Sequence, residues 1–235
     1  MQCGKNTCSS RFKKEGYLHP KPLIPIHGVP MIKLVIDNIR PQITHRFIFI
    51  CQKMHIGEYG LSDKLSVWAP NCEIISIDGI TEGAACTVLK ARDFVGVQDS
   101  LMIANCDQFV DIDINTYLSV LSTNDLDGLI MTMTANDPKW SYARLNHENL
   151  VTEVVEKEVI SNEATVGIYN FKTGKAFLDG ADEMISQNFR VNNEFYVAPI
   201  YNYLIARKNK IGIGALVKII RSGDVIPKIQ EVIVK

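Results

Sequence analysis

Leu101-Met-Ile-Ala-Asn-Cys-Asp107 is a short apolar run that ends directly in polar residues. Consecutive apolar residues without alternation are typical of a strand that is buried on both faces of a sheet. Such a strand requires helices on both sides, and the residues that follow it lie at its carboxyl end, where ligands bind in open α/β sheets. The stretch therefore predicts an α/β fold, and it predicts where in that fold polar side chains meet a ligand.

Strand and helix patterns alternate on both sides of this stretch. In the predicted helix that has Pro30 as its first residue and stops at Pro41, apolar residues recur at helical spacing. Strands are predicted over residues 46–51, 73–77, 101–104 and 128–134, and further helices from Ser62, over 84–94 and over 114–122. The alternation indicates three layers, with a mixed, mostly parallel sheet between helices.

From Tyr142 the pattern becomes antiparallel. Residues 142–145 and 151–156 flank the turn 146–149, which predicts an added hairpin, and a further strand is predicted over 165–171. Helices are predicted over 173–186 and 194–206, the second with Asn193 at its start. We expect one domain over residues 1–235, in which 207–235 form an atypical tail.

Composition and charge exclude several classes of protein. The 235 residues are 46% hydrophobic and 22% charged, with a net charge of −1, so no overall field attracts nucleic acid or an anionic membrane. No uncharged apolar run approaches the ~20 residues of a spanning helix, which favours a cytoplasmic protein without nucleic-acid or membrane partners. The six cysteines lack the spacing of a metal site and are expected to be reduced, mostly buried thiols.

The first 22 residues are locally basic, with five lysines or arginines against one acid. Within them, Ser9-Ser10-Arg11 and Pro20-Lys21-Pro22 suit a polyphosphate, because small residues let the backbone approach and prolines restrict the lysine. The alternative is a solvated basic loop.

Two further segments are candidates for the nucleotide and a metal. Asn105 and Asp107 follow the strand 101–104, and a carboxylate there suits Mg²⁺, although it also suits a turn or a helix cap. Glu82-Gly83-Ala84 opens a helix with residues small enough for a base to lie against the backbone, and tight helix packing is the alternative.

Candidates for a second substrate lie in the C-terminal half. Lys157 ends the hairpin and suits an acceptor phosphate, or else forms a surface pair with Glu156. Asn193 and Glu194 suit hydroxyls or an amide of an acceptor, or else a helix cap.

The order of these motifs is more specific than any one of them. It resembles the order in the sugar-phosphate nucleotidylyltransferases, in particular their small bacterial relatives from capsule and lipopolysaccharide gene sets, which are often labelled glycosyltransferase-like. The resemblance runs from about Ser9 to about Ala206. It rests on Arg11 with Pro20-Lys21-Pro22-Leu23, Gly28-Val-Pro-Met31, Glu82-Gly-Ala-Ala85, Asn105-Cys-Asp107, Glu156-Lys157, Ala164-Thr-Val-Gly-Ile-Tyr169 and Asn193-Glu194-Phe195.

The resemblance implies a Rossmann-like nucleotide-diphospho-sugar transferase fold. It also implies a Mg²⁺-dependent reaction in which an NTP and a small phosphorylated acceptor, such as a sugar phosphate, give the NDP-acceptor and pyrophosphate, toward surface polysaccharide precursors. In this role Arg11 meets the outgoing phosphates and Lys21 the α-phosphate. Asp107 then holds Mg²⁺, Lys157 touches the acceptor phosphate, and Gly83-Ala84 lies against the base.

Two segments depart from the family pattern. The chain lacks an apolar opening strand and has Ser9 where the family has glycine, and Asp224 is the candidate for a second metal carboxylate although its motif differs. A catalytically impaired nucleotide-binding relative is therefore one alternative. A glycosyltransferase of the same fold, using a nucleotide-sugar donor, is another, for which Asp111-Ile-Asp113 has the Asp-x-Asp spacing but lies past the strand end. CTP, UTP and dTTP remain candidates for the nucleotide.

Overall fold

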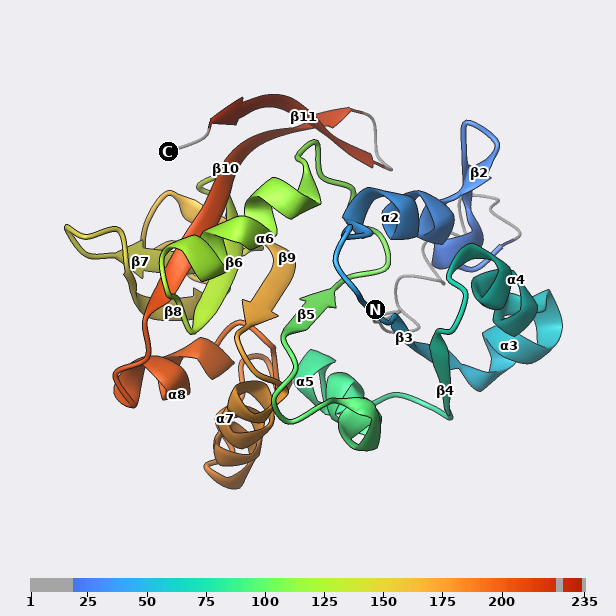
Figure 1. The fold of residues 1–235 in the computed structure, drawn as a ribbon, viewed down its shortest axis with the longest axis horizontal. Helices are drawn as coiled ribbons and strands as arrows, with labels where there is room; N and C mark the ends of the chain where they lie inside the picture. The colour runs from blue at the N-terminus through green and yellow to red at the C-terminus, as the bar shows by residue number, and fades with distance from the viewer. Residues whose placement is uncertain (1–18, 223–225, 234–235) are drawn as a thin grey trace. The chain divides into compact units, whose positions relative to one another are not determined.

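The computed structural model describes the backbone of residues 19–222 and 226–233 and the side chains of residues 19–214 (Figure 1). The chain divides into two compact units. Unit 1 comprises Met1–Phe94 and Ala104–Phe109, and unit 2 comprises Val95–Ile103 and Val110–Lys235. Both units contain helices and strands, which confirms the α/β class.

Unit 1 is organised around a buried cluster that its helices and strands share. Phe49 and Cys51 from one strand meet Ile32 and Ile36 from a helix in this cluster, and all four are at most 2% exposed. Strands β3 and β4 pair in parallel, and the short strands β1 and β2 pair antiparallel. The elements of unit 1 are η1 (Lys21–Leu23), β1 (Pro25–Ile26), β2 (Val29–Pro30), α2 (Met31–Ile39), β3 (Ile48–Gln52), α3 (Lys53–Tyr59), α4 (Leu61–Trp68), β4 (Glu73–Ile77), α5 (Ala84–Val88) and η2 (Leu89–Phe94).

Unit 2 is organised around a mixed sheet with the strand order β11-β10-β6-β9-β7-β8, in which β5 also pairs with β9. Strands β6 and β10 are parallel, whereas β6 with β9, β7 with β8, β7 with β9 and β10 with β11 are antiparallel. The mixed sheet and the hairpin are confirmed, with more antiparallel pairing than the alternating pattern predicts. The elements are β5 (Leu101–Ala104), α6 (Ile114–Thr123), β6 (Gly128–Thr134), β7 (Ser141–Leu145), β8 (Val151–Glu156), β9 (Glu163–Phe171), α7 (Gly174–Ser186), α8 (Ile200–Ala206), β10 (Ile211–Ser222) and β11 (Ile226–Ile233).

Helices α6 and α8 cover opposite faces of this sheet. A Cβ at Gly128 would lie 2.8 Å from the ring of Tyr201 in α8, and a Cβ at Gly214 would overlap the ring of Tyr117 in α6. Gly128 pairs with Ile211, and the next residue, Gly212, faces the other side of the sheet, where a Cβ would lie 2.5 Å from Leu126, just after α6. The strand between the two helices is accordingly buried from Gly128 to Met133. Unit 2 thus has the three layers that the sequence predicts.

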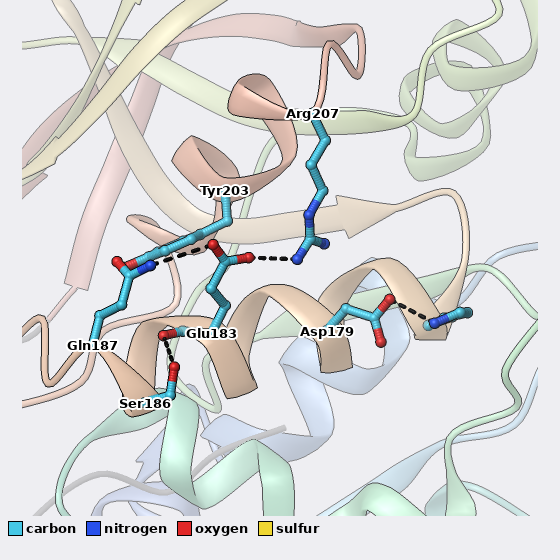
Figure 2. A network of polar contacts seen from close by, with 7 residues as sticks. Asp179, Glu183, Ser186, Gln187, Tyr203 and Arg207 are labelled. Atoms are coloured by element: carbon cyan, nitrogen blue, oxygen red, sulfur yellow. Dashed lines mark hydrogen bonds and ion pairs between the residues drawn. The ribbon is translucent and has the colours of Figure 1, made fainter.

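Helix α8 also fixes the edge strand β8. The side-chain amide of Asn202 accepts a hydrogen bond from the backbone N–H of Val154 at 2.8 Å and donates to its carbonyl at 2.7 Å. Helix α8 is held in turn by α7, where Glu183 accepts from Arg207 at 2.5 Å and Gln187 accepts from the hydroxyl of Tyr203 at 3.2 Å (Figure 2). Because β8 leads into Glu156 and Lys157, this chain of contacts positions one group of candidate residues.

Several helix boundaries differ from those predicted. Helix α2 begins at Met31 with Pro30 as its cap, and a further helix, α3, precedes α4. The helix predicted over 84–94 is α-helical only to Val88 and continues as a 3-10 helix. The helix predicted over 194–206 begins at Ile200, so a cap at Asn193 is wrong: Pro199 occupies the cap, and Asn193 lies in a separate turn.

Two predictions from composition are consistent with the described residues. The cysteines at 51, 72, 86 and 106 are free thiols, and burial raises the pKa of Cys51 to about 12, which keeps it protonated at neutral pH. None of the helices in residues 19–222 is long and apolar enough to cross a membrane.

Candidate functional site

The predicted site residues fall into two groups, one in each unit. The candidates for the nucleotide and metal that the structure describes all belong to unit 1: Lys21, Glu82, Gly83, Ala84, Asn105 and Asp107. The acceptor candidates Lys157, Asn193 and Glu194 belong to unit 2. Ser9, Ser10, Arg11 and Asp224 lie outside the described residues.

Lys21 and Asp107 form an ion pair in unit 1. Nζ of Lys21 contacts Oδ2 of Asp107, and the two side chains are only 24% and 27% exposed. The residues lie far apart in the sequence, at the start of η1 and just after β5. The structure therefore brings together the lysine predicted to meet a phosphate and the carboxylate predicted to hold a metal.

The backbone around both residues is anchored in the core of unit 1. Leu23 and Cys106 belong to the same buried cluster, at 6% and 2% exposure. The amide of Leu23 donates to the carbonyl of Pro20 at 2.8 Å, which closes the 3-10 turn that carries Lys21. Pro20 and Pro22 restrict the backbone on either side of the lysine. The two charges are thus presented from fixed backbone positions.

Gly83 lies in a turn that three hydrogen bonds stabilise. Its carbonyl accepts from the Thr81 hydroxyl at 3.0 Å, and from the hydroxyl and the amide of Thr87 at 3.1 Å each. The φ of Gly83 is +138°, a conformation that favours glycine, so this position requires the residue that the sequence has. Glu82 and Asn105 are exposed, and Ala84 is partly buried. The turn is thus hydrogen-bonded at Gly83, with the acidic side chain of Glu82 exposed beside it.

The donor set around Asp107 fits Mg²⁺ and not a metal that needs a complete protein cage. Among the described side chains, no group of three or more His, Cys, Asp or Glu is placed to hold a metal ion. Mg²⁺ retains water and usually takes one or two carboxylates together with phosphate oxygens. Asp107 offers a hard, partly exposed carboxylate that already contacts a cation. One such carboxylate is sufficient when a polyphosphate supplies further ligands.

Lys157 follows β8 in a left-handed conformation, with a φ of +63°. Its Nζ donates to the carbonyl of Lys139 at 2.8 Å, lies 3.6 Å from Oε1 of Glu156 and lies 5.7 Å from the ring centre of Tyr196. Its side chain remains 37% exposed. The ammonium is therefore oriented by neighbours and still accessible to an anion.

Glu156 is a buried acid to which the sequence analysis assigns no role of its own. Its side chain is 5% exposed, and Oε2 accepts a hydrogen bond from the hydroxyl of Ser141. Burial raises the pKa of Glu156, against the opposing effects of Ser141 and Lys157. Glu156 lies two residues after the buried Val154. A carboxylate at an inward position of a strand is the signal by which the sequence could have identified it.

Tyr169 joins this polar group from β9. Its hydroxyl lies 2.9 Å from that of Thr165, and burial together with the nearby Glu156 charge raises its pKa. Ser141 also hydrogen-bonds Tyr169. The carboxylate therefore lies within a connected set of hydroxyl groups, which lowers the cost of burying it.

Asn193 and Glu194 belong to a tight turn that precedes Tyr196. Val191 and Glu194 exchange backbone hydrogen bonds at 2.9 and 3.0 Å, and Asn192 and Asn193 both have positive φ, the arrangement of a type I′ turn. Burial and the charges of Glu194 and Glu156 raise the pKa of Tyr196 to about 12. The charge of Glu194 thus acts on both Tyr196 and Glu156, next to Lys157, which relates two of the three acceptor candidates of unit 2.

Comparison with known proteins gives a consistent result. The family described as Nucleotidyl transferase matches residues 17–195. The Bifunctional protein GlmU of Methanocaldococcus jannaschii is 24% identical over 155 residues, which are 65% of this chain and 35% of that protein. The chain thus spans about a third of the length of this relative.

Solved structures share the fold over most of the chain. The nucleoside-diphosphate-sugar pyrophosphorylase of Vibrio cholerae RC9 is 26% identical, with a TM-score of 0.71 and 87% of each chain covered. A UDP-glucose pyrophosphorylase solved with UDP-glucose is 16% identical, with a TM-score of 0.69 and coverage of 90% of this chain and 89% of the other. The second likeness extends to the fold alone.

Proposed function

The chain belongs to the nucleotidyl transferase family, and we propose from this that it transfers a nucleoside monophosphate from an NTP to a sugar phosphate or a similar small phosphate, with release of pyrophosphate. The observation that carries the proposal is the pairing of Lys21 with Asp107. An ammonium and a carboxylate held together in one partly buried place suit the two needs of phosphoryl chemistry, namely direct charge neutralisation and metal binding.

Each group of residues has a role in this proposal. Lys21 neutralises charge that develops on the α-phosphate, and Arg11 binds the outgoing phosphates. The small side chains of Ser9 and Ser10 let these phosphates approach the backbone. Asp107 would hold Mg²⁺, which supplies charge neutralisation on the phosphate oxygens when bound, and Asp224, outside the described residues, stays the candidate for a second metal carboxylate. The turn at Glu82-Gly83-Ala84 and the exposed Asn105 meet the nucleoside.

The acceptor is held by unit 2. Lys157 binds its phosphate, and the turn at Asn193 and Glu194 meets its polar groups. A phosphate with a second pKa near 6 is already a nucleophile at neutral pH, so alignment suffices and no general base is required. We propose synthesis of surface polysaccharide precursors as the setting, by the resemblance to relatives from such gene sets.

The structure does not favour a glycosyltransferase with an Asp-x-Asp metal site. Asp113 caps α6 by accepting from the amides of Asn115 and Thr116, each at 3.2 Å, and from the hydroxyl of Thr116 at 2.7 Å. These bonds lower its pKa to about 2. The carboxylate is thus engaged in capping α6, which favours the helix-cap role of Asp113 over a metal-ligand role.

The test is pyrophosphate release over a matrix of four NTPs and several phosphorylated acceptors. Lys21→Gln and Asp107→Asn are each expected to lower kcat about 10²–10³-fold, the usual effect of removing one charge-stabilising group. Lys33→Gln and Asp37→Asn are matched controls, because these residues form an exposed ion pair at 2.5 Å on α2. Full activity in both site variants would exclude the assignment.

The acceptor side is tested separately. Lys157→Gln is expected to raise the KM for the acceptor and to leave NTP affinity, measured by calorimetry, unchanged. Lys175→Gln on α7, where the lysine pairs with Asp179 at 2.6 Å, is the control. Equal loss of affinity for both substrates in Lys157→Gln would contradict the division between them.

A further inference from the structure

The Lys21–Asp107 ion pair places the lysine ammonium on the carboxylate that, in the proposed function, holds Mg²⁺. Oδ2 of Asp107 contacts the Lys21 ammonium, and each side chain is about three-quarters buried, which weakens solvent screening of the pair. A divalent ion on the same carboxylate would lie close to the ammonium, and the two cations would repel each other strongly. Lys21 and the metal are therefore alternatives on Asp107.

A polyphosphate resolves this conflict. Its anionic oxygens can accept the Lys21 ammonium, so the lysine exchanges one negative partner for another and is not left as an unpaired, partly buried charge. The backbone need not move, because Leu23 and Cys106 anchor the two residues in the same core cluster. Rotation of the flexible lysine side chain is sufficient.

We propose that this ion pair sets the order of binding: Lys21 holds Asp107 until a polyphosphate takes over the ammonium, and only then does Asp107 hold the divalent ion. The proposal rests on the proposed function of the two residues. It follows that the metal alone binds weakly and that removal of a residue assigned to catalysis, Lys21, strengthens metal binding.

The first test measures Mn²⁺ binding to the full chain without nucleotide, by electron paramagnetic resonance. Lys21→Met is expected to lower the dissociation constant about tenfold, the equivalent of about 1.4 kcal/mol. The double variant with Asp107→Asn should lose this gain. Lys33→Met removes the same charge from an ion pair elsewhere in unit 1 and should leave the affinity unchanged.

The second test measures binding of inorganic tripolyphosphate, by calorimetry, to the wild type and to Asp107→Asn. In EDTA the variant should bind several-fold more tightly, because Lys21 is released and a negative charge is removed. With Mg²⁺ present it should bind more weakly than the wild type. If Lys21 and Mg²⁺ compete for Asp107, the change in tripolyphosphate affinity caused by Asp107→Asn should therefore have opposite signs in EDTA and in Mg²⁺.

Unchanged Mn²⁺ affinity in Lys21→Met, or weaker tripolyphosphate binding by Asp107→Asn in both conditions, overturns the proposal. These outcomes are distinct from failure of the proposed function. An absence of pyrophosphate release with every substrate pair, together with the expected Mn²⁺ result, would reject the reaction and retain the competition. Normal turnover of the wild type, together with unchanged Mn²⁺ affinity in Lys21→Met, would retain the reaction and reject the competition.

Discussion

Replacement of the buried Glu156 by glutamine is expected to stabilise the protein at neutral pH. The carboxylate is 5% exposed and burial raises its pKa, so the folded state keeps it ionised at a cost. Glutamine retains an oxygen that can accept from the Ser141 hydroxyl, and it carries no charge. What it loses is the attraction to Lys157 at 3.6 Å.

The magnitude follows from these two opposing effects. An ion pair with a lysine that is 37% exposed contributes only about 0–1 kcal/mol. Replacement of a whole buried ion pair by apolar side chains is often neutral or stabilising by about 1–4 kcal/mol, and removal of one member is costly only where the other stays buried, which does not apply to the 37% exposed Lys157. We expect a net gain near the lower end, about 1 kcal/mol, which for a chain of this size raises Tm by about 2–4 °C.

The direction of the pKa shift of Glu156 determines how the stability of the folded protein changes with pH. Because the folded pKa of Glu156 is raised above its ordinary value of 4.5, the folded protein binds more protons than the unfolded chain between the two values. Wild-type stability therefore falls as pH rises through this range. The advantage of Glu156→Gln should be present at pH 7 and disappear below about pH 4.5.

Calorimetric Tm measurements from pH 4 to pH 8 test this expectation. Glu153→Gln is the control, since Glu153 lies on the same strand, is 47% exposed and pairs with Arg144 at 3.0 Å, and its Tm should change by less than about 2 °C at any pH. If Glu156→Gln is less stable than the wild type at pH 7, and the deficit grows with pH, the ionised carboxylate is stabilising and the reasoning is refuted.

Three further substitutions test the packing and the caps. Gly128→Ala should lower the free energy of unfolding by about 1–3 kcal/mol, because the new methyl group meets the Tyr201 ring at 2.8 Å. Gly57→Ala, with nothing within 4 Å of the new Cβ, should raise it by about 0.5–1 kcal/mol, and equal effects of the two substitutions in denaturant unfolding would be evidence against the clash. Tyr201→Phe should cost about 1–2 kcal/mol by removing the 2.8 Å hydrogen bond to the carbonyl of Asn170, and an unchanged unfolding midpoint would contradict this. Asp113→Ala should lower Tm at pH 7. Because the cap lowers the pKa of Asp113 from 3.8 to about 2, the difference in Tm between this variant and the wild type should shrink as pH falls from 3.8 to about 2, and a difference that stays constant would point to a role other than the charge.

Strands were predicted more closely than helices, for a physical reason. The apolar runs at 73–77, 101–104 and 128–134 match β4, β5 and β6 at both ends, since short continuous apolar runs are typical of strands, although only β6 is buried along nearly its whole length. Helix α3 was not predicted because its sequence has Gly57 at its centre and lacks a clear apolar face. The helix at 194–206 was placed too early because apolar residues before Pro199 are buried in a turn and not in a helix.

The sequence predicted which residues carry charge in the site, and it did not predict their partners. Lys21 and Asp107 were each chosen for local reasons, and their contact depends on the burial of Leu23 and Cys106 in one core cluster, which no local pattern contains. Glu156 was seen only as the neighbour of Lys157, because the hydroxyl groups of Ser141 and Tyr169 that surround it come from other strands.

The division of the candidate residues between two units, each with helices and strands of its own, has an evolutionary consequence. Residues proposed for the nucleotide and metal depend on unit 1, and those proposed for the acceptor depend on unit 2. Under the proposed function, substitutions at the turn of Asn193 and around Lys157 leave the core cluster that anchors Lys21 and Asp107 unchanged, so selection can alter the acceptor residues of unit 2 while the nucleotide residues of unit 1 are kept.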